Sequence, residues 1–169
     1  MKINEKGLAI IKRFEGLGDG NADTPDLEPY MDCVGIPTLG WGSCWGLSGD
    51  RVTLDHPPIT KDEAEFLLAR ELRQTENAIA RLVRVPITSN QFSAVCSLVY
   101  NIGSGNFQRS SVRMQINRGS FVDASNEFWK WRRASGRILK GLVRRREAER
   151  RLFVSIDQPI VTGGGPCLS

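Results

Sequence analysis

The chain has 169 residues, of which 40% are hydrophobic and 25% charged, and its net charge is +4. This composition is typical of a globular chain of one domain, and no apolar run approaches membrane-spanning length. Only a short apolar run precedes Lys12-Arg13, so we expect neither a signal peptide nor a membrane anchor. The sequence therefore predicts a protein that is made and folded in a cytoplasm.

The charges are unevenly distributed along the chain. Residues 1–60 contain five Lys or Arg against nine Asp or Glu, whereas residues 61–169 contain eighteen against ten. An acidic part facing a basic part suits a polyanionic polymer, and both a nucleic acid and a bacterial wall fit this pattern.

Cysteine and histidine usage does not indicate a zinc site, and no cofactor is expected. The four cysteines show no paired spacing and the one histidine has no second histidine nearby, so we expect no zinc site. Cys96 lies on the apolar face of an expected helix and is interpreted as a buried thiol. Cys33 and Cys44 bracket an expected hairpin, and we expect thiols there unless the protein is exported.

The first helix is expected to begin after Asn4, which can cap it, and to end at Gly16. Glu15 then lies in the last turn beside Phe14. The negative end of a helix dipole and an apolar neighbour both disfavour a charged carboxylate, which suits a proton donor. A solvated glutamate at a helix end is the alternative.

An acidic loop over 17–29 precedes short extended segments from Tyr30 to Trp45, where Asp32 and Thr38 present polar groups. Two carboxylates across a cleft are the minimal equipment for hydrolysing a glycosidic bond. Ordinary turn chemistry, in which Asp and Thr bind nearby backbone, is the alternative for both residues.

The remainder of the chain is predicted to be helical. Thr60 to Glu63 and Thr88 to Gln91 are two capping boxes. The first opens a helix of roughly 30 Å, long enough to join two lobes, and the second opens a buried helix. Further helices are expected over about 110–118, from Ser120 through Trp131, and over about 142–154, with a break over 103–106.

Two groups of residues have competing interpretations. Arginines between Arg144 and Arg151 alternate with Glu147 and Glu149, which favours a solvated, ion-paired face over specific nucleic-acid binding. Trp41 and Trp45 lie near the hairpin, where core packing is favoured over stacking on sugar rings.

Several motifs occur in one order along residues 2–155: Phe14-Glu15-Gly16, Tyr30-Met31-Asp32, Gly35 to Gly42, Leu82 to Pro86, Ser97 to Gly103 and Gly141 to Glu149. This ordered set resembles the phage-type lysozymes, the endolysins of glycoside hydrolase family 24. The resemblance implies an α+β, mainly helical, lysozyme-like two-lobe fold within a single domain, 1–169. It implies a small β-hairpin lobe over about 1–60, a connecting helix over about 61–82, a helical C-terminal lobe over about 83–155 and a flexible tail over 156–169.

The same resemblance implies hydrolysis of the β-1,4 bond between N-acetylmuramic acid and N-acetylglucosamine in peptidoglycan. Glu15 then matches the general acid, Asp32 the second carboxylate, and Thr38 the hydroxyl that positions water. Inversion is implied, with the two carboxyl groups roughly 6.5–9.5 Å apart. Asn101 and Ser110 match positions that line the glycan cleft.

The chain departs from the family pattern at two places. The stretch from Glu15 to Asp32 is longer by about eight residues, which a surface loop can absorb, and its acidic residues could replace Asp32: Asp19, Asp23, Asp26 and Glu28. Ser43 occupies a position where the family often has histidine.

The implied partners follow from the family. Bacterial peptidoglycan is the substrate, and no specific nucleic acid is expected. A monomer is expected to accumulate in the host cytoplasm and to reach the periplasmic wall after a holin releases it. The alternative is a catalytically silent wall-binding or virion structural protein on the same fold, against which the presence of Glu15, Asp32 and Thr38 together argues.

Overall fold

The computed structural model describes residues 1–21, 25–32 and 35–156. Within these ranges the chain forms helices and two short antiparallel hairpins, in the following order: α1 (Glu5–Glu15), β1 (Tyr30–Met31), β2 (Pro37–Thr38), α2 (Lys61–Leu82), α3 (Ser89–Ile102), α4 (Ser104–Arg109), α5 (Ser111–Asn117), α6 (Phe121–Glu127), the 3-10 helix η1 (Phe128–Trp131), β3 (Arg133–Ala134), β4 (Arg137–Ile138) and α7 (Lys140–Val154). In the first hairpin Tyr30 pairs with Thr38, and in the second Arg133 pairs with Ile138.

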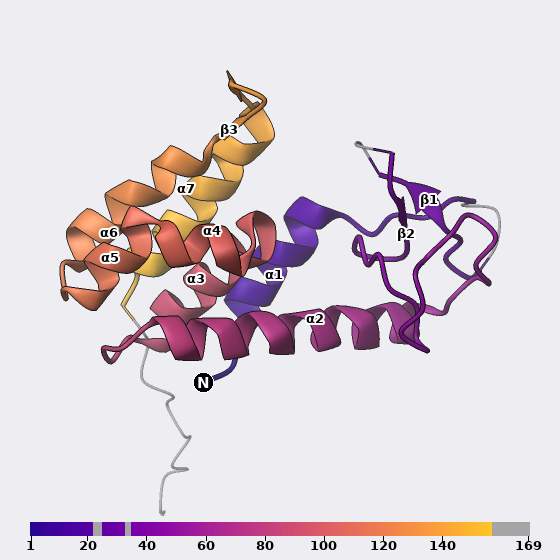
Figure 1. The fold of residues 1–169 in the computed structure, drawn as a ribbon, viewed down its shortest axis with the longest axis horizontal. Helices are drawn as coiled ribbons and strands as arrows, with labels where there is room; N and C mark the ends of the chain where they lie inside the picture. The colour runs from indigo at the N-terminus through magenta and orange to yellow at the C-terminus, as the bar shows by residue number, and fades with distance from the viewer. Residues whose placement is uncertain (22–24, 33–34, 157–169) are drawn as a thin grey trace, which may run out of the picture.

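Figure 1 shows the two lobes that the sequence predicts, joined by α2. This helix begins with the expected capping box, because the Glu63 N–H donates to Thr60 Oγ1 (3.2 Å) and the Thr60 N–H donates to Glu63 Oε2 (2.8 Å). Its first half packs on the small lobe and its second half on the helical lobe. The expected limits of the lobes and of the single domain stay predictions.

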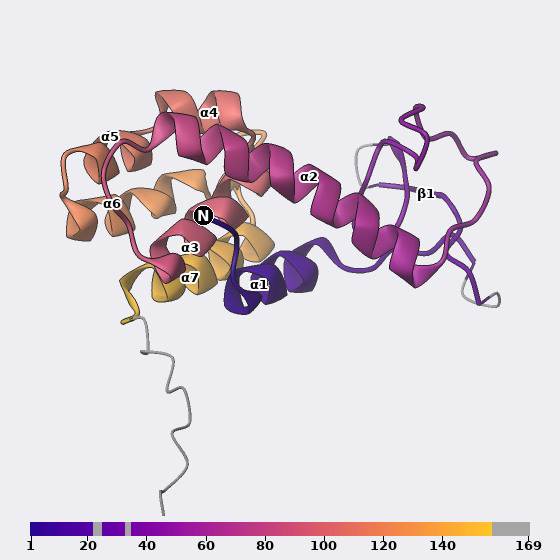
Figure 2. The same ribbon diagram turned by 90° about the horizontal axis from the view of Figure 1, so that it is seen from below.

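Helix α1 packs on α3 and α7 of the helical lobe, although the hairpin follows it in the sequence (Figure 2). The Asn4 side chain accepts from the Gly7 N–H (3.0 Å) and so caps the helix as expected. The Asn4 N–H also donates to Ser93 Oγ (2.9 Å), and Asn4 Nδ2 donates to Asn90 Oδ1 (2.9 Å). These bonds fix the start of α1 against α3.

Two apolar clusters support the lobes. One surrounds α3, which is buried along most of its length and packs on α1, α2 and α7. The fully buried side chains of this cluster include Phe107, Phe128, Phe153, Ile79 and Leu98. The other fills the small lobe and includes Ile11, Leu39, Trp41, Val52 and Leu67. Because Ile11 of α1 and Leu67 of α2 share the second cluster, both helices hold the small lobe in place.

The helical lobe differs from the sequence prediction in three places. Gly103 ends α3 as expected, but its positive φ (82°) redirects the chain so that α4 begins at once, with Phe107 fully buried. The hairpin β3–β4 was not predicted. Helix α7 begins at Lys140, two residues earlier than expected.

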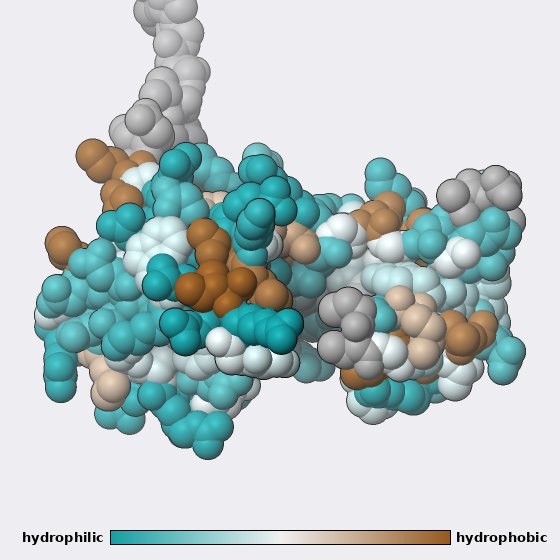
Figure 3. Space-filling view, turned by 90° about the horizontal axis from the view of Figure 1, so that it is seen from above, coloured by the Kyte–Doolittle hydropathy of each residue, from teal (hydrophilic) through white to brown (hydrophobic). Residues whose placement is uncertain are grey.

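The surface in Figure 3 is mostly hydrophilic and narrows between the two lobes. Among the described helices, none is both long enough and apolar enough to cross a bilayer. The predicted tail lies outside the described residues apart from Ile156, and so does Cys33, the expected neighbour of Cys44.

Candidate active site

Glu15 is the last residue of α1, and its carboxylate forms an ion pair with a buried arginine. Gly16, at φ 73°, ends the helix and donates its N–H to Lys12 O. Arg145 of α7 is 3% exposed, and its Nη1 lies 2.6 Å from Glu15 Oε1. Arg145 Nη2 donates to Ser97 O (3.2 Å), which fixes the guanidinium against α3. Beside the expected apolar neighbour Phe14, Glu15 therefore has a cation that holds one of its two oxygens, which the sequence did not indicate.

Arg145 is one member of a buried ionic network behind Glu15. Glu149 is fully buried and accepts from Ser97 Oγ (2.7 Å) and from Arg145 Nε (3.1 Å). The Nε of Arg146 lies 2.7 Å from Glu149 Oε2, an ion pair without hydrogen-bond alignment, and its Nη2 donates to Asn101 Oδ1 (3.0 Å). The expectation of a solvated arginine face is wrong for these residues, because their face of α7 packs against α3.

The network is electrically matched. Burial raises the pKa of Glu149, and the guanidiniums of Arg146 and Arg145 oppose that shift. Burial lowers the pKa of Arg146, and the Glu149 carboxylate opposes it. Two buried guanidiniums thus face two carboxylates, those of Glu149 and Glu15, so removing any one charge leaves the cluster unbalanced.

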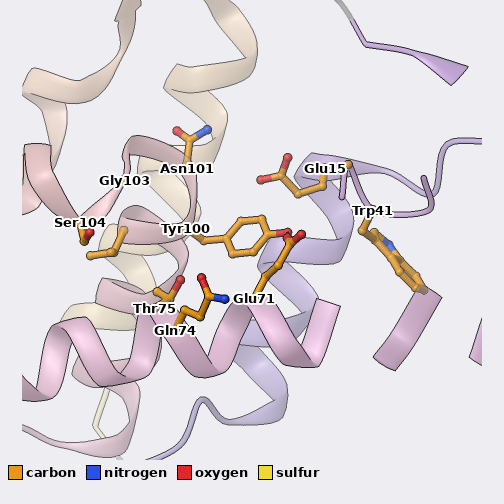
Figure 4. Close-up of a pocket in the computed structure, with 11 residues that line it drawn as sticks. Glu15, Trp41, Glu71, Gln74, Thr75, Tyr100, Asn101, Gly103 and Ser104 are labelled. Carbon is orange, nitrogen blue, oxygen red and sulfur yellow. The ribbon is translucent and has the colours of Figure 1, made fainter. Parts of the chain in front are cut away.

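A cavity of about 390 Å³ lies beside Glu15, between α2 and α3, and Trp41 and Gly42 of the small lobe also line it. Figure 4 shows the side chains of Glu71 and Tyr100 meeting next to the Glu15 carboxylate, with Asn101 further along α3. The residues that line the cavity are Glu15, Trp41, Gly42, Glu71, Gln74, Thr75, Val99, Tyr100, Asn101, Gly103 and Ser104. Asn101 therefore lies where a cleft residue is expected, and its role stays a prediction.

Glu71 joins the two lobes at this cavity. Tyr100 Oη donates to Glu71 Oε2 (2.8 Å), and Ser43 Oγ donates to Glu71 Oε1 (2.6 Å). Burial, and then the Glu71 carboxylate, raise the pKa of Tyr100 well above its usual range. Ser43 is thus bound to α2, and through Glu71 to α3 of the helical lobe.

Asp32 and Thr38 lie in the hairpin and are not among the residues that line this cavity. Asp32 Oδ1 accepts from the Ile36 N–H (2.8 Å), which closes the turn before β2. Thr38 is 1% exposed, and its Oγ1 donates to Tyr30 O (3.4 Å). The structure thus shows turn chemistry for both residues, and their catalytic roles stay predictions.

The other expected site residues have structural contacts. Ser110 is buried and caps α5, accepting from the Arg113 N–H (3.2 Å) and donating to Phe107 O (2.8 Å); it does not line the cavity. Asp19 accepts from the Asn21 and Glu28 N–H groups. Asp23 lies outside the described residues.

The sequence prediction missed Glu71, Tyr100 and Arg145 as site residues. A signal for Glu71 existed, because it lies four residues after Leu67 and so falls on the apolar face of α2. Within the described ranges, no three His, Cys, Asp or Glu side chains gather as a metal site.

Comparison with known proteins assigns this architecture to a family. Residues 12–149 match the family model described as phage lysozyme. The endolysin of Acyrthosiphon pisum secondary endosymbiont phage 1 is 39% identical, with 92% of this chain and 99% of the relative covered.

Two solved structures resemble the whole fold. A mutant of P22 lysozyme (the phage P22 enzyme, from a Salmonella phage) is 37% identical with a TM-score of 0.77, covering 92% of this chain and 99% of its own. The endolysin of Escherichia coli O157:H7 phage FAHEc1 is 32% identical with a TM-score of 0.80, and the match covers 94% of this chain and 97% of that endolysin. These likenesses confirm the predicted lysozyme-like fold, and the chain belongs to the phage lysozyme family of glycoside hydrolases.

Proposed function

We propose that this chain is an endolysin muramidase, which hydrolyses the β-1,4 bond between N-acetylmuramic acid and N-acetylglucosamine in bacterial peptidoglycan and so lyses the host cell. The observation that carries the proposal is the position of Glu15, at the end of α1 and in the wall of an inter-lobe cavity. Membership of the phage lysozyme family supports it.

Glu15 is proposed as the general acid. Arg145 binds Oε1, so Oε2 is the oxygen that can carry a proton to the leaving glycosidic oxygen. The guanidinium is itself held by Ser97 and Glu149, which keeps the carboxyl group in one orientation as the sugar enters. Proton transfer at the leaving oxygen accompanies cleavage of its bond to the anomeric carbon.

Asp32 and Thr38 are proposed to act on the opposite side of the sugar. Asp32 would stabilise the oxocarbenium-like transition state and, with the Thr38 hydroxyl, orient the attacking water. The attack would then invert the anomeric centre, which requires room for a water between the two carboxyl groups. Asn101, which already accepts from Arg146 at the cavity, and Ser110 are proposed to bind the glycan.

The biology proposed for the protein follows the family expectation. It accumulates as a monomer in the host cytoplasm, and a holin releases it to the periplasmic wall. Light scattering of the purified protein at micromolar concentration should give the mass of one chain, 18.8 kDa. A stable dimer at that concentration would contradict the monomer.

One assay tests the acid. Purified protein should release new reducing ends from peptidoglycan, and Glu15→Gln should abolish the release while the protein remains folded by circular dichroism. Retained cleavage in Glu15→Gln would overturn the assignment of the acid. Binding to peptidoglycan without any cleavage by the wild type would instead favour the silent wall-binding protein, which the comparisons do not favour. Proton NMR of the first product tests inversion, because the α-anomer should appear before mutarotation.

A further inference from the structure

A second hollow adjoins the Glu15 cavity. It has a volume of about 680 Å³ and shares three residues with that cavity: Gly42, Glu71 and Gln74. Trp45, Cys44, Gly49 and Arg70 complete its lining. Because Gly42, Glu71 and Gln74 form part of both walls, the two hollows are direct neighbours along α2.

Trp45 differs from its neighbour Trp41. Trp41 is 7% exposed and belongs to the small-lobe core, whereas Trp45 is 48% exposed in the hollow. The expectation that both tryptophans pack in the core is therefore wrong for Trp45. An indole left half exposed on a concave surface next to an active site is typical of a ligand contact.

The backbone beneath Trp45 is held firmly. Trp45 O accepts from Arg70 Nη2 (3.1 Å), and the Trp45 N–H donates to Ser43 Oγ (3.3 Å), whose own proton is shared with Glu71. Trp45 also pairs with Arg51 in a β-bridge, and the Arg51 guanidinium lies 5.4 Å from the centroid of the indole ring. These contacts fix the backbone that carries the ring and place Arg51 against the ring before any ligand binds, so less conformational entropy is lost on binding.

The chemistry of the two hollows points to a carbohydrate. An exposed indole offers an apolar face to the C–H groups of a sugar ring, while Glu71 and Gln74 offer acceptors and a donor to its hydroxyl and N-acetyl groups. The two Glu71 oxygens already bind Ser43 and Tyr100, so Glu71 is fixed in place at the point where the hollows meet.

We propose that Trp45 forms an additional sugar-binding subsite, which takes one further N-acetylated hexose of the glycan strand beyond those at the cleavage site. This proposal rests on the proposed muramidase function. The test measures oligomer binding and peptidoglycan cleavage separately, so that the subsite and the muramidase function can be refuted independently.

The binding arm uses N-acetylglucosamine oligomers of two to six sugars, titrated calorimetrically into Glu15→Gln protein, which leaves the ligand intact. The affinity of the protein for the oligomer should rise at the oligomer length that first reaches Trp45. In the Trp45→Ala double variant that gain should fall about two- to tenfold, the range expected for loss of one aromatic contact. Trp45→Phe should retain most of the gain.

The matched control is Phe66→Ala, which removes a 58% exposed aromatic ring that lines neither hollow. It should leave the binding of every oligomer unchanged. The subsite would be overturned if Trp45→Ala and Phe66→Ala lowered the oligomer affinity equally. It would also be overturned if protein with Trp45 intact bound oligomers of every length with the same affinity.

The cleavage arm uses wild-type Glu15. Trp45→Ala should raise KM for peptidoglycan about two- to tenfold with kcat nearly unchanged, because the contact is made equally before and during the reaction. A fall in kcat alone would contradict a binding role. Oligomer binding that depends on Trp45 in a protein that cleaves no peptidoglycan would refute the proposed function but not the subsite.

Discussion

Glu149→Gln tests whether the buried ionic network behind Glu15 holds the helical lobe together. The substitution keeps the size of the side chain and removes one negative charge from a fully buried position. Glu149 contacts Ser97, Arg145 and Arg146. After the change, two buried guanidiniums face only the Glu15 carboxylate, so one positive charge remains uncompensated in the interior.

Removing one partner of a buried ion pair typically costs about 3–5 kcal/mol of unfolding free energy. The amide oxygen of Gln can still accept one hydrogen bond, so the lower half of that range is expected. For a chain of this length each kcal/mol lowers Tm by about 2–4 °C. The Tm of Glu149→Gln should therefore lie roughly 6–16 °C below that of the wild type.

Helix α7 supplies the matched control. Glu147 also pairs with an arginine four residues on, since Arg151 Nε lies 2.7 Å from its Oε1, but Arg151 is 78% exposed. Glu147→Gln should cost no more than about 1 kcal/mol. Urea unfolding followed by circular dichroism at 222 nm measures both variants. Equal losses of unfolding free energy in Glu149→Gln and Glu147→Gln would refute the reasoning that the contribution of the network to stability comes from its burial.

Three more predictions concern the hairpin and the cavity. Thr38→Ala should lower kcat on peptidoglycan more than it raises KM, and equal changes in both would contradict a role in positioning water. Gly40→Ala should destabilise the protein by about 2 kcal/mol or more in urea unfolding, because Gly40 has φ +56° and a Cβ there would lie 2.7 Å from Ala64 Cβ; unchanged stability would refute this. The raised pKa of Tyr100 means that the unfolded chain loses this proton near pH 10 while the folded chain keeps it. The free energy of unfolding should thus fall above pH 10. In a pH titration of the folded proteins, the tyrosinate absorbance at 295 nm should rise by the same amount in wild type and in Tyr100→Phe, because Tyr100 does not ionise before unfolding. A larger rise in the folded wild type would contradict the buried, protonated hydroxyl.

Local signals predicted the helices well. Thr60 and Thr88 each form the reciprocal capping box read from the sequence, and Asn4 and Gly16 bound α1 as expected. Such signals succeed because both partners of each bond lie within four residues, so no knowledge of the fold is needed. The long apolar face of α3 is equally local.

Long-range contacts explain what was missed. Arg145, Arg146 and Glu149 occupy the inward spacing that apolar residues usually fill, in line with Leu152, and this pattern could have indicated burial. Their partners Glu15 and Ser97 are remote in sequence, so no local rule identifies them. The turn at Ser135-Gly136, with both residues at positive φ, carried a hairpin signal that was overlooked.

The position of α1 has a consequence for synthesis of the chain. This helix is synthesised before α3 and α7, yet its start is hydrogen-bonded to Ser93 and Asn90 of α3, and the ionic partner of Glu15 lies in α7. A ribosome must therefore translate the chain through Arg145 before Glu15 can reach its final setting. Each nascent molecule therefore passes most of its synthesis before Glu15 can form its ion pair with Arg145.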